Sequence, residues 1–303
     1  MTLAVGARGV FVLAVALAAG LPSVLGAYQL NVAVTLLMWI ALAQSWTILS
    51  GLAGYVSLGH VVFYGLGAYT TVVTWKLLPL VIAVPLAGLV AALFALAVGA
   101  PVLRVRGPYF AILTFGLAEL VKFSVINLEA ALGKSSRLLF GAPSTTVMFY
   151  ALLGLAAAAT ALTHGVRHGR LGRALIAIRE DETTAETIGI AVARYKIIAF
   201  ALSALIPGMV GALMVLRSSY FEAMQVFSPT ISFTIVTMAI IGGADDARGP
   251  IVGAVFLTLL AEVLWARAPQ LYMILLGLLL VGFVLFAPRG IVGTLAARPG
   301  PAA

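Results

Sequence analysis

Cysteine is absent from this chain of 303 residues, and charged residues make up only 9% of it. The absence of cysteine excludes disulfide bridges and thiolate metal centres, and it carries no information about the redox compartment. Charged residues are about a quarter of an ordinary soluble domain, so their scarcity excludes a soluble globular protein. Hydrophobic residues supply 63% of the chain, and the mean hydropathy is +1.15. The composition is typical of a membrane protein.

The apolar runs recur along the whole chain and approach the length of about 20 residues that a helix needs to cross hydrocarbon. The alternating segments of about ten residues that are typical of outer-membrane barrels are missing. The sequence therefore predicts an all-α, polytopic helical bundle that forms one transmembrane domain over residues 1–303. Arg8 and the apolar run after it resemble a signal peptide, but the many downstream spans favour an uncleaved first helix. The ten expected spans are about 9–27, 30–50, 51–75, 80–100, 108–128, 145–163, 196–217, 227–242, 250–267 and 271–288.

Ten spans place both termini on one side of the membrane, and the basic residues indicate which side that is. With the termini in the cytoplasm, twelve of the 18 Lys and Arg residues lie inside and six lie outside. Cytoplasmic loops carry such a basic excess, so we expect a multi-pass inner-membrane protein with cytoplasmic termini. The same bias accounts for the net charge of +8. No basic stripe with interleaved aromatic residues indicates nucleic-acid binding.

One charged segment, residues 164–196, separates two long apolar stretches, and with cytoplasmic termini it is cytoplasmic as well. It holds six of the 18 basic residues and four of the 10 acidic residues. Apolar residues recur in it at helical intervals, acidic residues cluster in the middle, and Gly189 supplies a stop. The apolar positions are Leu175, Ile178, Ala185 and Ile188.

This pattern predicts a short amphipathic helix after Gly172 and Arg173, or two helices with a turn near 181–183, with a solvated charged loop as the alternative. An interfacial helix on anionic lipid would carry basic residues on its polar face. Here the polar face is largely acidic, so a groove on another protein suits the segment better.

The expected span 51–75 contains five glycines, with Ser57 and His60 between them. A glycine inside a helix costs about 1 kcal/mol relative to alanine. Broken backbone at membrane depth persists only where it packs on protein or lines a wet cavity. We therefore expect this span inside the bundle and not against lipid. The span 227–242 begins with Phe-Ser-Pro and ends with Ile-Ile-Gly-Gly, so it is predicted to be kinked or only partly spanning.

No complete motif for chemistry is present. The tripeptide at 133–135 ends like a phosphate-binding loop, but Leu128 stands where the motif requires glycine. His164 and His168 have metal-ligand spacing without a third ligand. We therefore predict no catalytic residue, no metal site and no bound cofactor. Four ionisable groups within the spans are candidates for function, because burying them in hydrocarbon is costly. These are His60, Glu119, Lys122 and Glu262, of which Glu119 and Lys122 are spaced to pair.

Several stretches together resemble one family, the permease subunits of bacterial branched-chain amino acid ABC importers, and among these the M-type. The resemblance extends over nearly the whole chain, and the combination of stretches is highly specific. It is carried by GLAGYVSLGHVVFYGLGAY at 51–69, LRVRGPYFAILT at 103–114, GRALIAIREDETTAETIGI at 172–190, KIIAFALSALIPGMVGAL at 196–213, IGGADDARGPIVGA at 241–254 and PRGIVG at 288–293.

The resemblance implies an arrangement of about ten helices like that of the vitamin B12 importer. It also implies a second permease (a copy or a paralogue), two cytoplasmic ATPase subunits that bind ATP and Mg, and a periplasmic amino-acid-binding protein. The matching stretch is the family's coupling region, which docks on the ATPase. Carried over to this chain, it comprises Gly172, Arg173, Ala174, Arg179, Glu180, Asp181, Glu182, Ala185 and Gly189.

For the substrate pathway, at the interface between two permeases, we expect Ser57, His60 and Phe63 to line the route, with Thr114 as a weaker choice. The chain departs from the family at 132–137, where Leu-Gly-Lys-Ser-Ser-Arg replaces the usual Thr-Gly-Gly-x-x-Gly turn on the outer side. This departure leaves the substrate open, since relatives move short amides, urea and aromatic acids. A sugar-type ABC permease and a secondary transporter remain alternatives.

Overall fold

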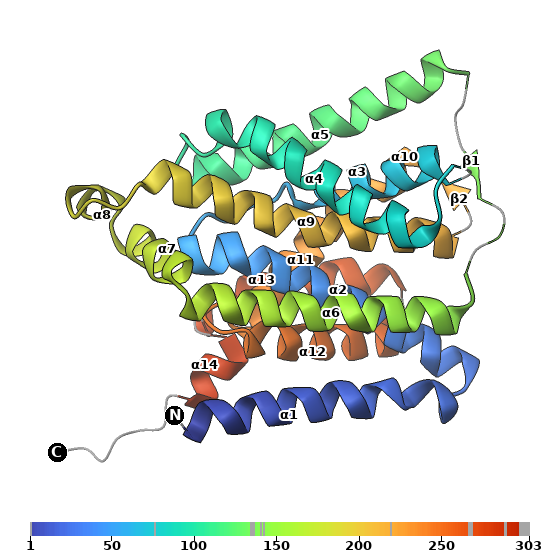
Figure 1. Cartoon of the computed structure of the whole chain (residues 1–303), viewed down its shortest axis with the longest axis horizontal. Helices are drawn as coiled ribbons and strands as arrows, with labels where there is room; N and C mark the ends of the chain where they lie inside the picture. The colour runs from blue at the N-terminus through green and yellow to red at the C-terminus, as the bar shows by residue number, and fades with distance from the viewer. Residues whose placement is uncertain are drawn as a thin grey trace.

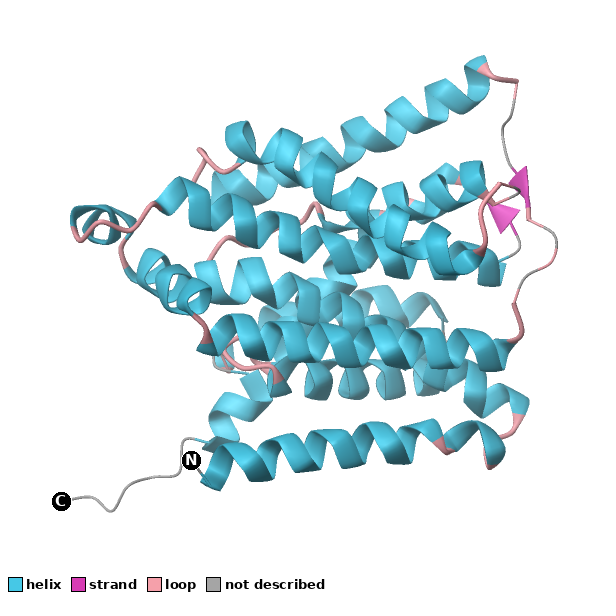
Figure 2. Cartoon of the chain, viewed as in Figure 1, coloured by secondary structure: helices cyan, strands magenta, loops and turns pink. Residues whose placement is uncertain are grey.

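The protein is a bundle of helices whose long axes run roughly alongside one another (Figure 1). The computed structural model describes residues 2–75, 77–133, 137–139, 141, 143–218, 220–265, 269–287 and 290–296. A helix lies at each of the ten predicted spans, and loops gather at the two ends of the bundle (Figure 2). These helices are α1 (Thr2–Ala19), α2 (Ala27–Trp46), α3 (His60–Thr74), α4 (Leu80–Val102), α5 (Pro108–Ala131), α6 (Thr145–His168), α9 (Val192–Ser218), α11 (Pro229–Gly242), α12 (Arg248–Trp265) and α13 (Pro269–Phe286).

Six stretches of the described chain are long and apolar enough to cross a membrane. They are Ala27–Gly51, Leu80–Val102, Pro108–Ala131, Thr145–His168, Val192–Ser218 and Ala223–Gly242. Six such helices make this a multi-pass membrane protein, because each needs about 20 apolar residues to cross the hydrocarbon. The full set of ten spans stays a prediction.

Short elements mark the two ends of the bundle. Figure 1 shows α7, α8, α14 and the start of α1 at one end, which we call the α8 end. The other end carries α10 and two strands, and we call it the strand end. There β1 (Arg137–Leu138) pairs antiparallel with β2 (Tyr220–Phe221). The remaining elements are a 3₁₀ turn (Leu21–Ser23), a π-helical turn (Thr47–Gly51), α7 (Arg170–Glu180), α8 (Glu182–Thr187), α10 (Ala223–Val226) and α14 (Gly290–Ala296).

Helix α9 is the centre of the packing, since α3 and α4 both lie along it. Glycine residues allow the backbones of α3 and α9 to approach each other closely. A Cβ added to Gly67 on α3 would lie 1.9 Å from the carbonyl oxygen of Gly208 on α9. A Cβ on Gly211 would lie 2.0 Å from the carbonyl oxygen of Tyr64. Small residues let apolar helices approach backbone to backbone in this way.

The structure changes the description of three predicted segments. The span 51–75 is not one helix, because residues 54–59 have no regular secondary structure and α3 begins only at His60. Gly54 has a φ of +76° and turns the chain there. We call these non-helical residues, 54–59, the extended segment. The connection between the two long helices is shorter than the predicted segment 164–196, since α6 continues to His168 and α9 already begins at Val192. The span 227–242 holds one unbroken helix, α11, which begins at Pro229, so no kink lies within it. The break lies before the predicted span, between α10 and α11, and partial spanning stays a prediction.

Replacing Gly67 by alanine is expected to destabilise the bundle by about 1–3 kcal/mol, the usual cost of overpacking. The added methyl group would meet backbone of α9, which cannot move aside as a flexible side chain can. A lower melting temperature in detergent would show this. Gly154→Ala on α6 is the matched control, because nothing lies within 4 Å of its added Cβ. Equal melting temperatures for the two variants would contradict the close approach of α3 and α9.

Candidate functional site

The α8 end carries the two short helices that the charged pattern predicted. Helix α7 ends at Glu180, and Asp181 caps α8 by accepting hydrogen bonds from the backbone nitrogens of Thr183 at 2.8 Å and Thr184 at 3.0 Å. A carboxylate at this position pairs amide groups that would otherwise lack partners. The predicted turn near 181–183 is therefore confirmed. Gly189 follows the end of α8 with a φ of +87°, as its role as a stop predicted.

The start of α7 was predicted too late. The helix begins at Arg170, so Gly172 and Arg173 lie within it and do not precede it. Glycine is required at position 172, because an added Cβ would lie 2.2 Å from the carbonyl oxygen of Val166 at the end of α6. The close turn between α6 and α7 therefore explains this glycine.

The α7–α8 pair rests on the bundle by its apolar side. Leu175, Ile178 and Ala185 are buried, as their helical spacing predicted. Ile188 is 70% exposed, so its predicted place on the same face is wrong. It lies beyond the last turn of α8, where the chain turns away into Gly189. The exposed residues of the pair therefore include Ile188 and acidic residues, among them Glu180, whose side chain is 73% exposed.

Two of the predicted coupling residues also contact the bundle. The Nη1 atom of Arg179 donates to the carbonyl oxygen of Gly51 at 2.8 Å and to Oδ1 of Asp245 at 2.7 Å. Arg179 thus joins α7 to the π-helical turn after α2 and to the loop between α11 and α12. The other predicted positions are divided by burial. Gly172, Ala174 and Ala185 are buried; Arg173, Glu180, Asp181 and Gly189 are at least partly accessible on this end.

Glu182 is the second inward-facing residue, and three groups converge on its carboxylate. Lys196 Nζ donates to Oε1 at 2.7 Å, Tyr55 Oη donates to Oε2 at 2.7 Å, and Arg106 Nε lies 3.1 Å from Oε2. Burial alone would raise the pKa of Glu182, but the hydrogen bonds from Lys196 and Tyr55 and the charges of Lys196 and Arg106 hold that pKa below its usual value. We call Lys196, Glu182, Tyr55 and Arg106 the Lys196 cluster.

Sequence reasoning placed Lys196 in a solvated segment and attached no role to Tyr55 or Arg106. Lys196 is only 4% exposed, because α9 begins early and carries it into the bundle. The sequence signal that could have indicated this burial was the position of Lys196 directly before the apolar run that starts at Ile197. A lysine inside a packed helix needs a partner of opposite charge, and the nearest acidic residues in the sequence lie in 180–186.

A polar pocket of about 260 Å³ lies between α7 and α8 on one side and the chain around Gly54 on the other. It brings the coupling region against the glycine-rich stretch, which sequence alone could not place together. Its lining is Ala53, Gly54, Tyr55, Arg106, Gly107, Ile178, Arg179, Glu180, Asp181 and Glu182.

Behind this pocket, the extended segment 54–59 enters the interior, and side chains satisfy its backbone. Thr114 Oγ1 accepts from the nitrogen of Leu58 at 3.1 Å, and Trp46 Nε1 donates to the carbonyl oxygen of Ser57 at 2.8 Å. Ser232 Oγ accepts from the nitrogen of Val61, one residue into α3, at 3.1 Å. The predicted packing of broken backbone on protein is therefore confirmed, because hydrocarbon could supply none of these partners.

The four predicted pathway residues lie close to this segment, and all four are buried within the chain. Ser57, Phe63 and Thr114 are at most 2% exposed. His60 is fully buried and packs edge-on against Phe63, with ring centroids 5.6 Å apart. Neither ring nitrogen of His60 has a hydrogen-bond partner among the described residues. The structure thus brings these residues together in the interior, next to the hydroxyl groups that hold the extended segment.

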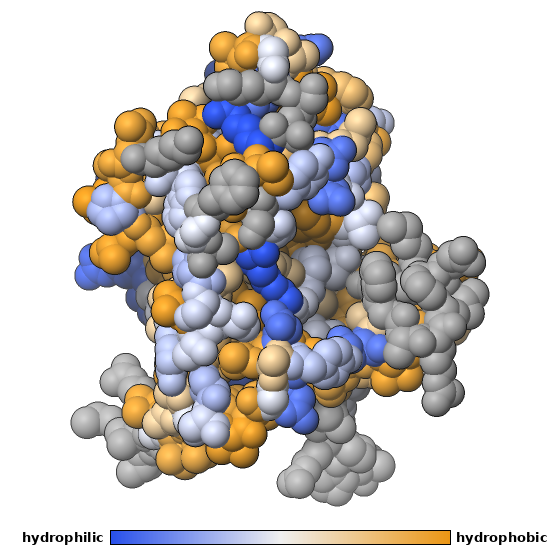
Figure 3. All heavy atoms as spheres, turned by 90° about the vertical axis from the view of Figure 1, so that its right-hand side faces the viewer, coloured by the Kyte–Doolittle hydropathy of each residue, from blue (hydrophilic) through white to orange (hydrophobic). Residues whose placement is uncertain are grey.

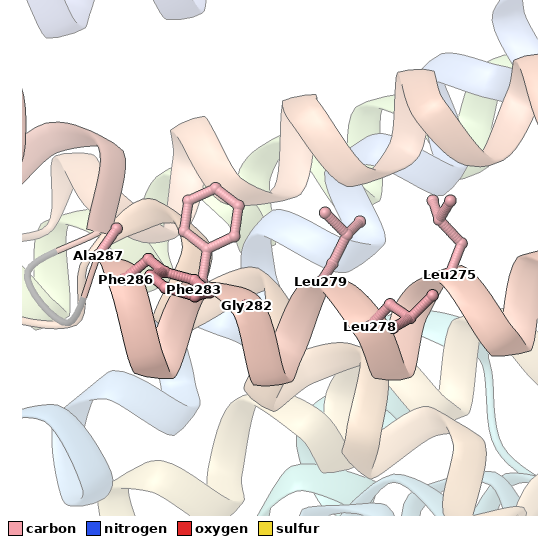
Figure 4. Close-up of a pocket in the computed structure, with 7 residues that line it drawn as sticks. All are labelled: Leu275, Leu278, Leu279, Gly282, Phe283, Phe286 and Ala287. Carbon is pink, nitrogen blue, oxygen red and sulfur yellow. The ribbon is translucent and has the colours of Figure 1, made fainter.

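A second pocket of the described chain lies along α13 and is apolar. It is an apolar groove of about 340 Å³ along α13, lined by Leu275, Leu278, Leu279, Gly282, Phe283, Phe286 and Ala287 (Figure 4). All of these residues come from one helix or its end, and none offers a polar side chain. Such a surface suits the acyl chains of lipid and offers nothing to orient a polar solute.

At the strand end, hydrophilic residues form a band between hydrophobic margins (Figure 3). Arg137 makes two hydrogen bonds to Glu129, at 2.8 and 2.6 Å, and Tyr69 Oη donates to the same carboxylate at 2.8 Å. Arg137 is the last residue of the altered turn 132–137, of which 134–136 lie outside the described residues. The predicted pairing of Glu119 with Lys122 is confirmed, at 2.5 Å.

The bundle of apolar helices, with a charged helical pair at one end that contacts a broken span inside, defines a multi-pass membrane protein. Residues 28–284 match the family model described as the branched-chain amino acid transport system / permease component. The chain belongs to this family, and it is a transport subunit.

Two curated relatives carry the same description, the high-affinity branched-chain amino acid transport system permease protein LivM. The chain is 28% identical to LivM of Salmonella typhimurium, in an alignment that covers 87% of this chain and 69% of the relative. It is also 28% identical to LivM of Escherichia coli, with coverage of 91% and 72%. No solved structure matches the chain.

Acidification is expected to loosen α8, because both carboxyl groups that hold it have lowered pKa values. Backbone hydrogen bonds from Thr184 and Thr183 lower the pKa of Asp181, and the Lys196 cluster lowers that of Glu182. Groups of this kind stabilise the fold above their unfolded pKa, about 3.8 and 4.5 here, and lose that effect as the pH falls through the folded pKa. Amide protons of residues 183–188 should therefore exchange slowly near pH 6 and faster below about pH 4 after correction for intrinsic rates.

Glu182→Gln should show a smaller change over this pH range, since only Asp181 then titrates at this place. A response as large as that of the unaltered chain would contradict the role of Glu182.

Proposed function

We propose that the chain is one of two permease subunits of an ATP-driven importer for branched-chain or similar hydrophobic amino acids. The family match over 28–284 supports the transport class, and the name of the LivM relatives supports the substrate. The second permease is a paralogue in this proposal. A periplasmic binding protein delivers the amino acid, and two cytoplasmic ATPase subunits bind ATP and Mg and hydrolyse the nucleotide. The chain itself contributes no catalytic residue, metal or cofactor.

The proposal includes an inner-membrane topology of ten spans, in an arrangement like that of the vitamin B12 importer. Both termini and the α8 end face the cytoplasm. The location of α14 and of the start of α1 at the α8 end is consistent with an even number of spans (Figure 1). The excess of basic residues on that side supports its assignment as cytoplasmic.

The single observation that carries the mechanism is the α7–α8 pair, which is exposed on one side and tied to the interior on the other. Glu180 and Ile188 face outward, where a groove of an ATPase subunit can receive them. Arg179 and Glu182 face inward and contact Gly51 and Tyr55, at the entrance to the extended segment. When the ATPase dimer closes, it moves the α7–α8 pair and rocks the attached helices between outward- and inward-facing states.

The amino acid passes at the interface of the two permeases in this proposal. Ser57, His60, Phe63 and Thr114 are close to the route, and the opening of the bundle exposes them. His60 supports this choice, because its two ring nitrogens have no partner among the described residues. A buried polar group is normally paired, so a ligand or water that enters in another state would satisfy it.

Glu180→Lys should reduce co-purification of the ATPase subunits by about tenfold, the effect of losing ~1.4 kcal/mol of binding. Glu180 is a good probe because it is exposed, whereas reversal of Asp181 would also remove the cap of α8. Glu222→Lys at the strand end is the matched control, since the Glu222 side chain makes no capping bond to α10. Gel filtration checks that both variants are folded. Undiminished co-purification of Glu180→Lys would contradict docking at this surface.

Transport itself should require the complete assembly. In proteoliposomes that contain both permeases, the ATPases and the binding protein, ATP should drive uptake of radiolabelled leucine. Uptake that persists with this chain alone would identify a secondary transporter. ATP-driven uptake of ribose, urea, a short amide or an aromatic acid, without uptake of leucine, would identify an ABC permease for another small solute.

A further inference from the structure

We propose that Lys196 is a positioning residue that joins the α7–α8 pair to the extended segment 54–59, so that the two move as one unit. The inference rests on the proposed function and extends it from the docking surface to the interior. It concerns a group that lies on neither the docking surface nor the expected pathway.

The contacts of Lys196 use all three donors of its ammonium group. Nζ lies 2.7 Å from Glu182 Oε1, 3.0 Å from Tyr55 Oη and 3.0 Å from the carbonyl oxygen of Leu103. These acceptors come from three different parts of the chain, namely α8, the extended segment and the turn after α4. Lys196 itself belongs to α9, the helix at the centre of the packing.

The hydrogen bonds of the Lys196 cluster also form a closed ring. Tyr55 Oη donates to the second carboxylate oxygen of Glu182, so the lysine, the tyrosine and the carboxylate form a ring of hydrogen bonds. The ring of Tyr55 lies under the ammonium group at 4.8 Å and packs edge-on against Phe110 of α5. Separating α8 from this cluster would leave a buried charge without its partner, which is far more costly than moving the cluster as a whole.

A movement of α8 is therefore transmitted through Glu182 to Tyr55, the second residue of the extended segment. Ser57 lies two residues further on, and its carbonyl oxygen is held by Trp46 of α2. His60 begins α3. Only Gly54 of the segment donates its backbone N–H in a helical hydrogen bond, to the carbonyl oxygen of Ser50 at 3.2 Å. Beyond it, side-chain hydroxyl groups accept from the nitrogens of Ser57 and Leu58, so few helical bonds resist this displacement. The arrangement joins a docking contact at the end of the bundle to the buried residues near the proposed route.

The decisive variant is Tyr55→Phe, which removes one hydroxyl group and keeps the Lys196–Glu182 ion pair and the aromatic ring. In the complete importer in proteoliposomes, we expect the ATPases to remain bound and active. The amount of leucine taken up per ATP hydrolysed should fall by about fivefold or more, the lower range for coupled sites. Lys196→Met combined with Glu182→Gln removes the ion pair of the link without leaving a buried charge unpaired, since Arg106 is 57% exposed, and should lower this ratio further.

Tyr69→Phe is the matched control. Tyr69 also donates to a carboxylate that pairs with a cation, Glu129 with Arg137, but at the strand end. Its leucine-to-ATP ratio should stay unchanged. A structural loss common to any buried tyrosine hydroxyl would lower both ratios alike, and that result would overturn the proposal. So would an unchanged ratio in Tyr55→Phe.

The absence of cysteine permits a second readout that a merely structural role would not alter. A single thiol at Val56→Cys, a position that is 42% exposed, reports on the extended segment. Its rate of maleimide labelling should change when a non-hydrolysable ATP analogue binds the assembled importer, and Tyr55→Phe should remove most of that change. An equal change in both backgrounds would overturn the link. If the unaltered importer shows no ATP-driven uptake, the proposed function fails instead, and the two failures are thus distinguished.

Discussion

The backbone of residues 54–59 leaves the helical path inside a bundle of apolar helices, and this constrains everything around it. Neither lipid nor an apolar interior pairs the N–H and C=O groups that a helix would otherwise have satisfied. The partners therefore come from neighbouring helices, with Thr114 from α5 and Trp46 from α2. Each partner ties one helix to the segment. A stretch that is irregular in itself thus becomes the point at which several spans are held together.

The α8 end is built on the same physical basis. Arg179 and Glu182 were expected to dock on a partner protein, and both also contact the bundle, where the chain offers a carbonyl group and a buried lysine. What remains outside is a small surface with Glu180 and Ile188. The α7–α8 pair can therefore both bind a partner and stay attached to the bundle, which one helix face could not do. One side is free to bind, and the other is fixed to the elements that must move.

Sequence periodicity predicted the positions of the long helices well, because spans of about 20 apolar residues have few other stable arrangements. It also predicted the break near Asp181, since a short acidic residue between two helical patterns is a strong cap. It failed for Ile188 and Lys196. Both failures have one reason: helical spacing describes a face only within a helix, and α8 ends before Ile188 while α9 begins before Lys196. The pathway candidates near 57–63 were placed together by proximity along the chain, and their complete burial was not predictable.

By itself, the sequence determined that this is a multi-pass helical membrane protein with one charged segment of helical pattern and one span broken by glycine. Those features follow from local composition, since hydrophobic length, helix capping and glycine content act over a few turns. Only the tertiary structure decided which charges are free and which are paired. The partners of Lys196 come from residues 55, 103 and 182, and no periodicity relates such distant positions. The cost of an unpaired buried charge brings them together, and it acts only once the helices have packed.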